Sequence, residues 1–217
     1  MTHVHCGCKG LVVTPAPLKD SWSRTFYQPL LLKNNAAALL ATVPSDVECT
    51  LDASFGMLCI NQFDQCGLFL QAGEAFVKAG LEYADKEIRL SVVVTNHGFS
   101  DWSTQSWRYD RGEGPLASSL RLRLHKLNPP QGPCILIEAD TSEASEPLKW
   151  CPNEGPRARW TFVRIAPIHA EVGVPWRCGV FCAAPVAAGT VASFSHASIW
   201  PKAELSHDSD SSAMTSK

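Results

Sequence analysis

The sequence lacks a long apolar run, since none of its 217 residues belongs to a stretch of the roughly 18 apolar residues that a membrane-spanning helix needs. It also lacks an excess of one charge, because 19 Lys and Arg stand against 21 Asp and Glu. A net charge of -2 provides no positive field, so we expect neither nucleic acid nor a membrane as a partner. The first residues contain no apolar secretion signal, and we expect a cytoplasmic protein.

Three common catalytic motifs are absent. The sequence has no G-x-S-x-G, no G-x-G-x-x-G after a strand and no G-x-x-x-x-G-K-[ST]. This excludes a nucleophile elbow, a dinucleotide-binding fold and a P-loop, and we expect no cofactor. His3, His5, Cys6 and Cys8 could hold a metal, but no second ligand cluster of matching spacing follows, so we predict no metal site.

Nine cysteines without regular spacing also exclude a disulfide framework, and they are typical of reduced, buried thiols in an intracellular protein. Short alternating stretches, separated by 14 Gly and 15 Pro, dominate the chain instead. They predict strands at 47–53, 66–70, 77–83, 90–95, 120–125, 134–137, 161–165, 179–183 and 191–199. Residues 29–41 fit either a helix or two strands with a turn at Asn34 and Asn35.

Many short strands indicate an all-β sandwich or barrel built as one domain. We assign residues 21–202 to this domain, residues 1–20 to an N-terminal arm, and the polar residues 203–217 to a disordered C-terminal tail. Nothing in the sequence fixes the oligomeric state.

The two faces of these strands differ in chemistry, because successive side chains point to opposite sides of a sheet. One set is apolar and predicts the core: Cys66, Leu68, Leu70, Val77, Ala79, Leu81, Tyr83, Leu90, Val92, Val94, Leu120, Leu122 and Leu124. The alternate set is mixed and consists of Gln65, Gly67, Phe69, Lys78, Gly80, Glu82, Ser91, Val93, Thr95, Arg121, Arg123 and His125.

A solvated outer surface is the simpler interpretation of this second face, and two details favour a ligand cleft. Gly67 and Gly80 lie inside strands, where a glycine often marks a close approach to the backbone. Lys78 and Glu82 lie on the same side of one strand and could donate and accept a proton. Asp64 and Glu82 could also form a hydrolase pair, but we expect Lys78 to hold Glu82 as a bridged anion.

Four ordered motifs resemble those of the regulation-of-enolase-type family. They are WSRTFY at 22–27, FDQCGL at 63–68, VKAGLEY at 77–83, and SVVVT at 91–95 followed by FSDWS at 99–103. The resemblance spans residues 22–200 and implies a concanavalin A-like jelly-roll β-sandwich of two antiparallel sheets, with the matched polar residues on one concave face. Phe76 replaces the usual Trp and Cys66 the usual Ala, so the substrate of relatives does not transfer directly.

The resemblance also implies a cofactor-independent cyclase of fungal secondary metabolism that promotes a hetero-Diels–Alder-type cycloaddition of a small apolar substrate. The alternatives are a carbohydrate-binding protein and a non-catalytic regulator of enolase that use the same cleft. For the cyclase we expect Lys78, Glu82 and Asp64 as catalytic residues. We expect the substrate to be bound by Trp22, Tyr27, Gln65, Phe69, Ser91, Thr95, Trp102 and Arg121.

Overall fold

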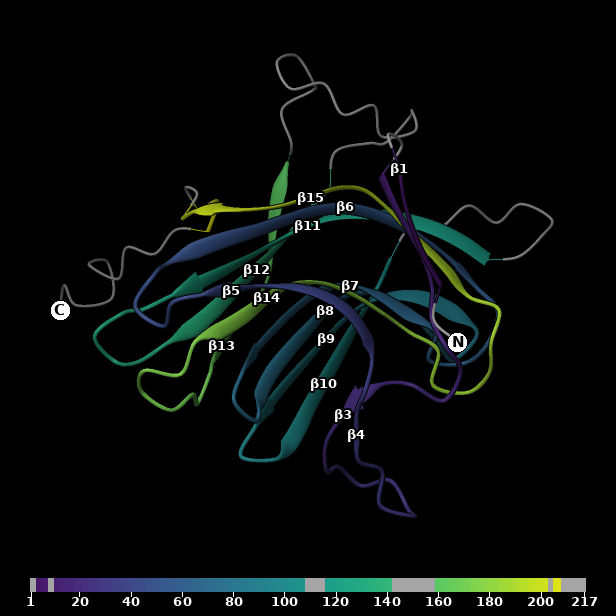
Figure 1. Cartoon of the computed structure of the whole chain (residues 1–217), viewed down its shortest axis with the longest axis horizontal. Coiled ribbons are helices and arrows are strands. Elements are labelled where there is room, and N and C mark those ends of the chain that lie inside the picture. The colour runs from purple at the N-terminus through teal and green to yellow at the C-terminus, as the bar shows by residue number, and fades with distance from the viewer. Residues whose placement is uncertain (1–2, 8–9, 108–115, 142–158, 203–204, 208–217) are drawn as a thin grey trace, which may run out of the picture.

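The computed structural model describes residues 3–7, 10–107, 116–141, 159–202 and 205–207. These residues form strands, turns and irregular segments but no helix, and therefore none that is long and apolar enough to cross a membrane. The strands build two large antiparallel sheets that face each other, as the two layers in Figure 1 show. This confirms the predicted all-β sandwich.

One layer is a seven-stranded sheet in the order β1-β2-β15-β6-β11-β12-β13. Its strands are β1 (His3–Gly7), β2 (Gly10–Thr14), β6 (Cys49–Cys59), β11 (Leu116–Leu127), β12 (Cys134–Asp140), β13 (Trp160–Pro167) and β15 (Val191–Pro201).

The other layer is a six-stranded sheet in the order β10-β9-β8-β7-β14-β5. Its strands are β5 (Ala37–Val43), β7 (Gln65–Ala72), β8 (Ala75–Ala84), β9 (Glu87–Asn96), β10 (Phe99–Ser106) and β14 (Trp176–Ala183). The short strands β3 (Ser21–Trp22) and β4 (Lys33–Asn34) pair with each other. Residues 20–36 lie against the outer face of the six-stranded sheet, and we call them the strap.

The main core lies between the two sheets and contains the apolar set that alternation predicted. Leu68, Val77, Leu81 and Leu122 are each no more than 1% exposed. All nine predicted strands coincide with or overlap observed ones. Residues 29–41 contain β4 and part of β5 rather than a helix, which agrees with the alternative of two strands. These two strands do not pair with each other, because β4 pairs with β3 and β5 pairs with β14.

The predicted N-terminal arm is wrong for residues 3–14. Here β1 pairs with β2, and β2 pairs with β15 at the edge of the seven-stranded sheet. Val13 belongs to the core because its side chain points between the sheets. In the predicted tail, Ser206 donates hydrogen bonds from its backbone N and its Oγ to Glu138 Oε1 on β12. Residues 203–204 and 208–217 lie outside the described residues.

Candidate functional site

Polar side chains gather on the outer face of the six-stranded sheet, beneath the strap. We call this set the polar cluster, and its members are Asp20, Gln65, Lys78, Glu82, Ser91 and Thr95. The register places Gln65 opposite Glu82 and Lys78 opposite Val93, so side chains of three neighbouring strands share one face. All six are buried, which shows that they lie in a sheltered position and not on a solvated surface.

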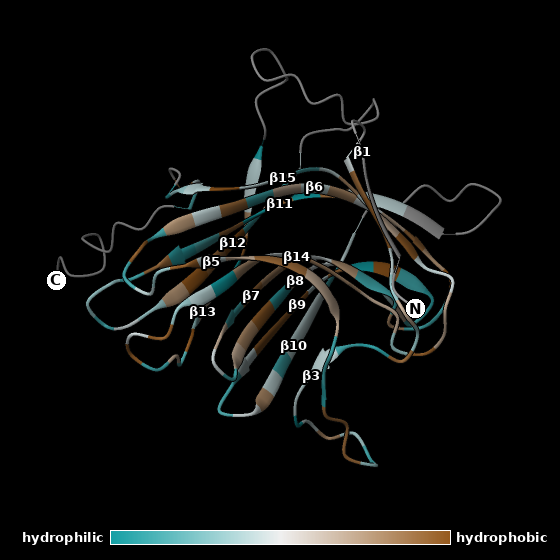
Figure 2. Ribbon diagram, viewed as in Figure 1, coloured by the Kyte–Doolittle hydropathy of each residue, from teal (hydrophilic) through white to brown (hydrophobic). Residues whose placement is uncertain are grey.

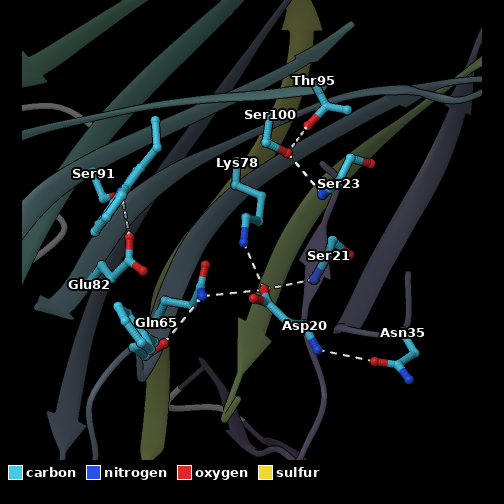
Figure 3. Close-up of polar contacts among 12 residues, drawn as sticks. Asp20, Ser21, Ser23, Asn35, Gln65, Lys78, Glu82, Ser91, Thr95 and Ser100 are labelled. Atoms are coloured by element: carbon cyan, nitrogen blue, oxygen red, sulfur yellow. Dashed lines mark hydrogen bonds and ion pairs between the residues drawn. The ribbon is translucent and has the colours of Figure 1, made fainter. Parts of the chain in front are cut away.

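Lys78 of β8 is anchored by the strap. Its Nζ lies 2.7 Å from Asp20 Oδ1, and the two side chains are only 3% and 9% exposed. The same oxygen accepts hydrogen bonds from Gln65 Nε2 at 3.3 Å and from the backbone N of Ser21 at 2.7 Å (Figure 3). The ammonium also lies 5.7 Å from the ring centre of Trp22. Asp20 therefore balances the charge of Lys78 in a buried environment.

Glu82 lies four residues after Lys78, on the same face of β8. Its Oε2 accepts hydrogen bonds from Ser91 Oγ at 2.5 Å and from Trp102 Nε1 at 3.1 Å. Burial raises the pKa of the Glu82 carboxyl from 4.5 to about 7, even though Lys78 and the Ser91 hydrogen bond lower it. A carboxyl with this pKa can both take up and release a proton near neutral pH.

The predicted bridge between Lys78 and Glu82 is wrong. Lys78 donates to Asp20, a residue that the sequence analysis had placed in the arm. Because the nearest carboxylate to Lys78 comes from the strap, Glu82 is left to the neutral donors Ser91 and Trp102. The proton affinity of Glu82 thus follows from its burial more than from a bound cation.

A second set of contacts holds the strap to the sheet. Thr95 Oγ1 and Ser100 Oγ lie 2.8 Å apart, and Ser100 Oγ accepts a hydrogen bond from the backbone N of Ser23 at 3.0 Å (Figure 3). The backbones of Arg24 and Ser100 are also hydrogen bonded. Thr95 therefore helps, through Ser100, to hold the strap against the sheet.

Aromatic rings enclose the polar cluster. Trp22 packs edge-on against Trp102 with 6.0 Å between the ring centres, and its ring centre lies 5.9 Å from that of Tyr27. The ring centres of Trp102 and Phe63 are 6.3 Å apart. Beneath the strap they join a small apolar cluster that also contains Phe69, Phe76, Val93 and Phe181. Trp22 is 6% exposed, and its buried Nε1 has no hydrogen-bond partner among the described residues. A buried unpaired N–H is costly, so this position favours an acceptor atom from outside the chain.

The close approach of the neighbouring strand explains the two glycines inside β7 and β8 without a ligand. Gly67 and Gly80 face each other across β7 and β8. A Cβ on Gly80 would lie 1.9 Å from the carbonyl oxygen of Cys66, and a Cβ on Gly67 would lie 2.1 Å from that of Ala79. The partner strand is what approaches each glycine. A consequence is that the face carries no side chain between Lys78 and Glu82.

Two predicted site residues lie elsewhere. Asp64 turns away from the polar cluster, and its Oδ2 accepts hydrogen bonds from the backbone N of Ile60 and of Asn61 in the turn before β7. Arg121 lies on β11 of the other sheet, where it forms a two-pronged ion pair with Asp52 at 3.0 Å. The alternation of side chains places Arg121 on an outer face of a sheet. This face belongs to the seven-stranded sheet, however, and the polar cluster lies on the six-stranded sheet.

Lys78, Glu82, Gln65, Ser91 and Thr95 are brought together as predicted, together with the rings of Trp22, Tyr27, Phe69 and Trp102. Sequence reasoning missed Asp20, Phe63 and Phe181. Phe181 had a usable signal, since it alternates with the core residues Val180 and Cys182 of β14. Phe63 belongs to the FDQCGL motif, but alternation does not predict where its ring points, because a turn in which its φ is +69° directs the ring.

The described residues contain no group of three or more His, Cys, Asp or Glu side chains arranged to hold a metal ion. His3, His5 and Cys6 lie in β1, whose side chains are not described, and Cys8 lies outside the described residues. A separate apolar surface pocket of about 360 Å³ lies between the β11–β12 connection and the end of β13, and it includes Pro129, Ile165 and His169. It contains none of the polar cluster.

The fold has counterparts among solved structures. A functionally unknown protein from Saccharomyces cerevisiae has a TM-score of 0.71 and 22% sequence identity, over 93% of each chain. A bifunctional GH43-CE of Bacteroides eggerthii has a TM-score of 0.58 and 13% identity, over 94% of this chain and 22% of that one. At these identities the likeness is one of fold alone. No curated protein matches the chain.

One protein family matches residues 3–202, which include all the strands of the described residues and the whole polar cluster. The chain belongs to this family, which is described as "Protein of unknown function (DUF1349)".

Proposed function

We propose that this protein is a cofactor-independent cyclase that promotes a hetero-Diels–Alder-type ring closure of a small, largely apolar substrate beneath the strap. The observation that carries the proposal is the buried Glu82 carboxyl, whose pKa of about 7 suits a general acid and base. Lys78 lies four residues before Glu82 on the same strand face, and aromatic rings surround both. Formation of a heterodiene by loss of water needs acid–base chemistry, and its cycloaddition needs an apolar enclosure that holds the two reactants together.

The reaction has two steps, the loss of water and the cycloaddition. In the first, Glu82 takes the phenolic proton of an ortho-hydroxybenzyl alcohol while the benzylic C–O bond breaks, and the departing hydroxide takes a proton from Lys78 to leave as water. The product is a heterodiene with a conjugated carbonyl, and a proton passed from Glu82 to Lys78 restores both groups. In the second, an alkene adds to the heterodiene with formation of one C–O and one C–C bond, without gain or loss of protons or electrons.

The remaining residues support orientation. The unpaired Nε1–H of Trp22 and the ammonium of Lys78 are suited to hydrogen bond the carbonyl oxygen as it gains charge. Gln65, Ser91 and Thr95 fix the strap and the carboxyl. Phe69, Tyr27 and Trp102 provide apolar walls that hold two reactants together, and such positioning is worth roughly 7 to 11 kcal/mol in favourable cases.

Carbohydrate binding is less well supported. A sugar-binding face typically presents an exposed aromatic ring, whereas Trp22 is 6% exposed and packs edge-on against Trp102. The likeness to the Bacteroides eggerthii chain concerns the fold alone. As part of the proposal we place the protein in the cytoplasm, because Cys49, Cys59, Cys66, Cys134, Cys178 and Cys182 are all free thiols.

The test uses salicyl alcohol and ethyl vinyl ether, which combine to ethoxychroman with loss of water. The wild-type chain should accelerate chroman formation over buffer and give one enantiomer in excess. Glu82→Gln should lower the rate at least tenfold, whereas Glu74→Gln, in the exposed turn between β7 and β8, should match the wild type. Equal rates for wild type, E82Q and buffer would overturn the cyclase, and a specific signal on a glycan array would then favour sugar binding.

A further inference from the structure

The strand β5 forms one edge of the six-stranded sheet. It pairs with β14 on one side, and on the other side it has no strand partner among the described residues. Its seven residues thus present a row of backbone N–H and C=O groups that no neighbouring described strand satisfies. An edge of this kind is a template for another strand.

Natural proteins protect such edges with charge, proline or a bulge, and β5 has none of these. Its sequence is AALLATV, and Figure 2 shows no hydrophilic colour along it. Its register with β14 is continuous from Ala37 to Val43. The opposite edge strand, β10, differs, because Asp101 there forms an ion pair with Arg164. Leu39 on β5 is 65% exposed.

We propose that two copies of this chain pair through β5, edge to edge and antiparallel, into one continuous sheet. A twofold axis through the centre of β5 would place Leu40 opposite the partner's Leu40. It would also place Leu39 opposite Ala41, Ala38 opposite Thr42, and Ala37 opposite Val43. Every pair is uncharged, and four of the seven residues are small enough for close approach of the backbones.

A second copy is favoured over an unrelated peptide because this register matches the strand with itself without a single charged or bulky aromatic pair. Residues 34–45, which contain β5, carry no charged side chain, so no charge next to the strand would repel a second copy at the junction. The inference concerns assembly and does not depend on the chemistry at Glu82.

The test is sedimentation equilibrium of the full chain over a wide concentration range. We expect the mass to rise from 23.6 kDa to twice that value. The double variant Leu39→Lys and Ala41→Lys places like charges opposite each other at two positions, and it should raise the dimer dissociation constant at least tenfold. A control with lysine at the exposed Val172 and Val186, outside β5, should dimerise as the wild type does.

A wild-type chain that stays monomeric at all concentrations would overturn the inference, and so would a dimer that the β5 double variant leaves intact. If the double variant fails to fold, amide hydrogen exchange of the wild type tests whether the chain pairs through β5. Amides of residues 37–43 should exchange more slowly as concentration rises, and exchange that is independent of concentration would refute pairing through β5.

Discussion

The substitution Glu82→Gln tests the physical state of the candidate site without any substrate. A carboxyl with a pKa of about 7 in the folded chain and 4.5 in the unfolded chain takes up a proton on folding. Because the folded pKa is raised, this group stabilises the fold at low pH, and the stabilisation is lost as the pH rises through 7. Linkage gives a loss of about 2.5 kcal/mol between pH 5 and pH 8.

Glutamine has the shape of the neutral acid and cannot ionise. Relative to the wild type, the free energy of unfolding of E82Q should therefore rise by about 2.5 kcal/mol between pH 5 and pH 8, so that E82Q is the more stable protein at pH 8. Urea denaturation at several pH values measures this difference, and taking the difference removes the contribution of other titrating groups. A difference that does not change with pH, or one that favours the wild type at pH 8, would refute a buried, nearly neutral Glu82. Glu74→Gln, in an exposed turn, serves as the control.

Three further substitutions test the surroundings. Lys78→Met should destabilise the fold by about 3 to 5 kcal/mol in chemical denaturation, because it leaves Asp20 buried and unpaired, and adding Asp20→Asn should restore most of the loss. Gly80→Ala should lower the melting temperature, since overpacking costs typically about 1 to 3 kcal/mol and the new Cβ meets the backbone of Cys66. Arg121→Gln should leave the rate of chroman formation unchanged, and a slower rate would place Arg121 in the site after all.

The alternation of side chains was sufficient to predict which residues share a face of β7, β8 and β9. The pleat of a strand fixes this property locally, so Gln65, Lys78 and Ser91 could be grouped without knowledge of the fold. Alternation does not say which sheet a strand joins. Arg121 was assigned to the site for that reason, although β11 pairs with β6 in the opposite layer.

The partner of Lys78 could not be predicted, because Asp20 is 58 residues away in the sequence and lies before the first predicted strand. Its position depends on the path of the strap across the sheet. Asp64 shows the converse limit. It directly precedes β7 and matched a family motif, but at the start of a strand a side chain can serve the turn, and Asp64 hydrogen bonds to the backbone N of Asn61.

The choice of partner by Lys78 influences the proton affinity of Glu82, although burial is the largest cause of its raised pKa. Lys78 lowers the pKa of Glu82, while Asp20 raises it, so the ion pair between Lys78 and Asp20 cancels much of the electrostatic help that a buried Glu82 carboxylate would receive. Burial then dominates, and the pKa reaches about 7. If Asp20 were absent, the uncompensated ammonium would stabilise the carboxylate and lower its pKa. The strap therefore does more than cover the face, because through Asp20 it keeps Glu82 able to exchange a proton near neutral pH.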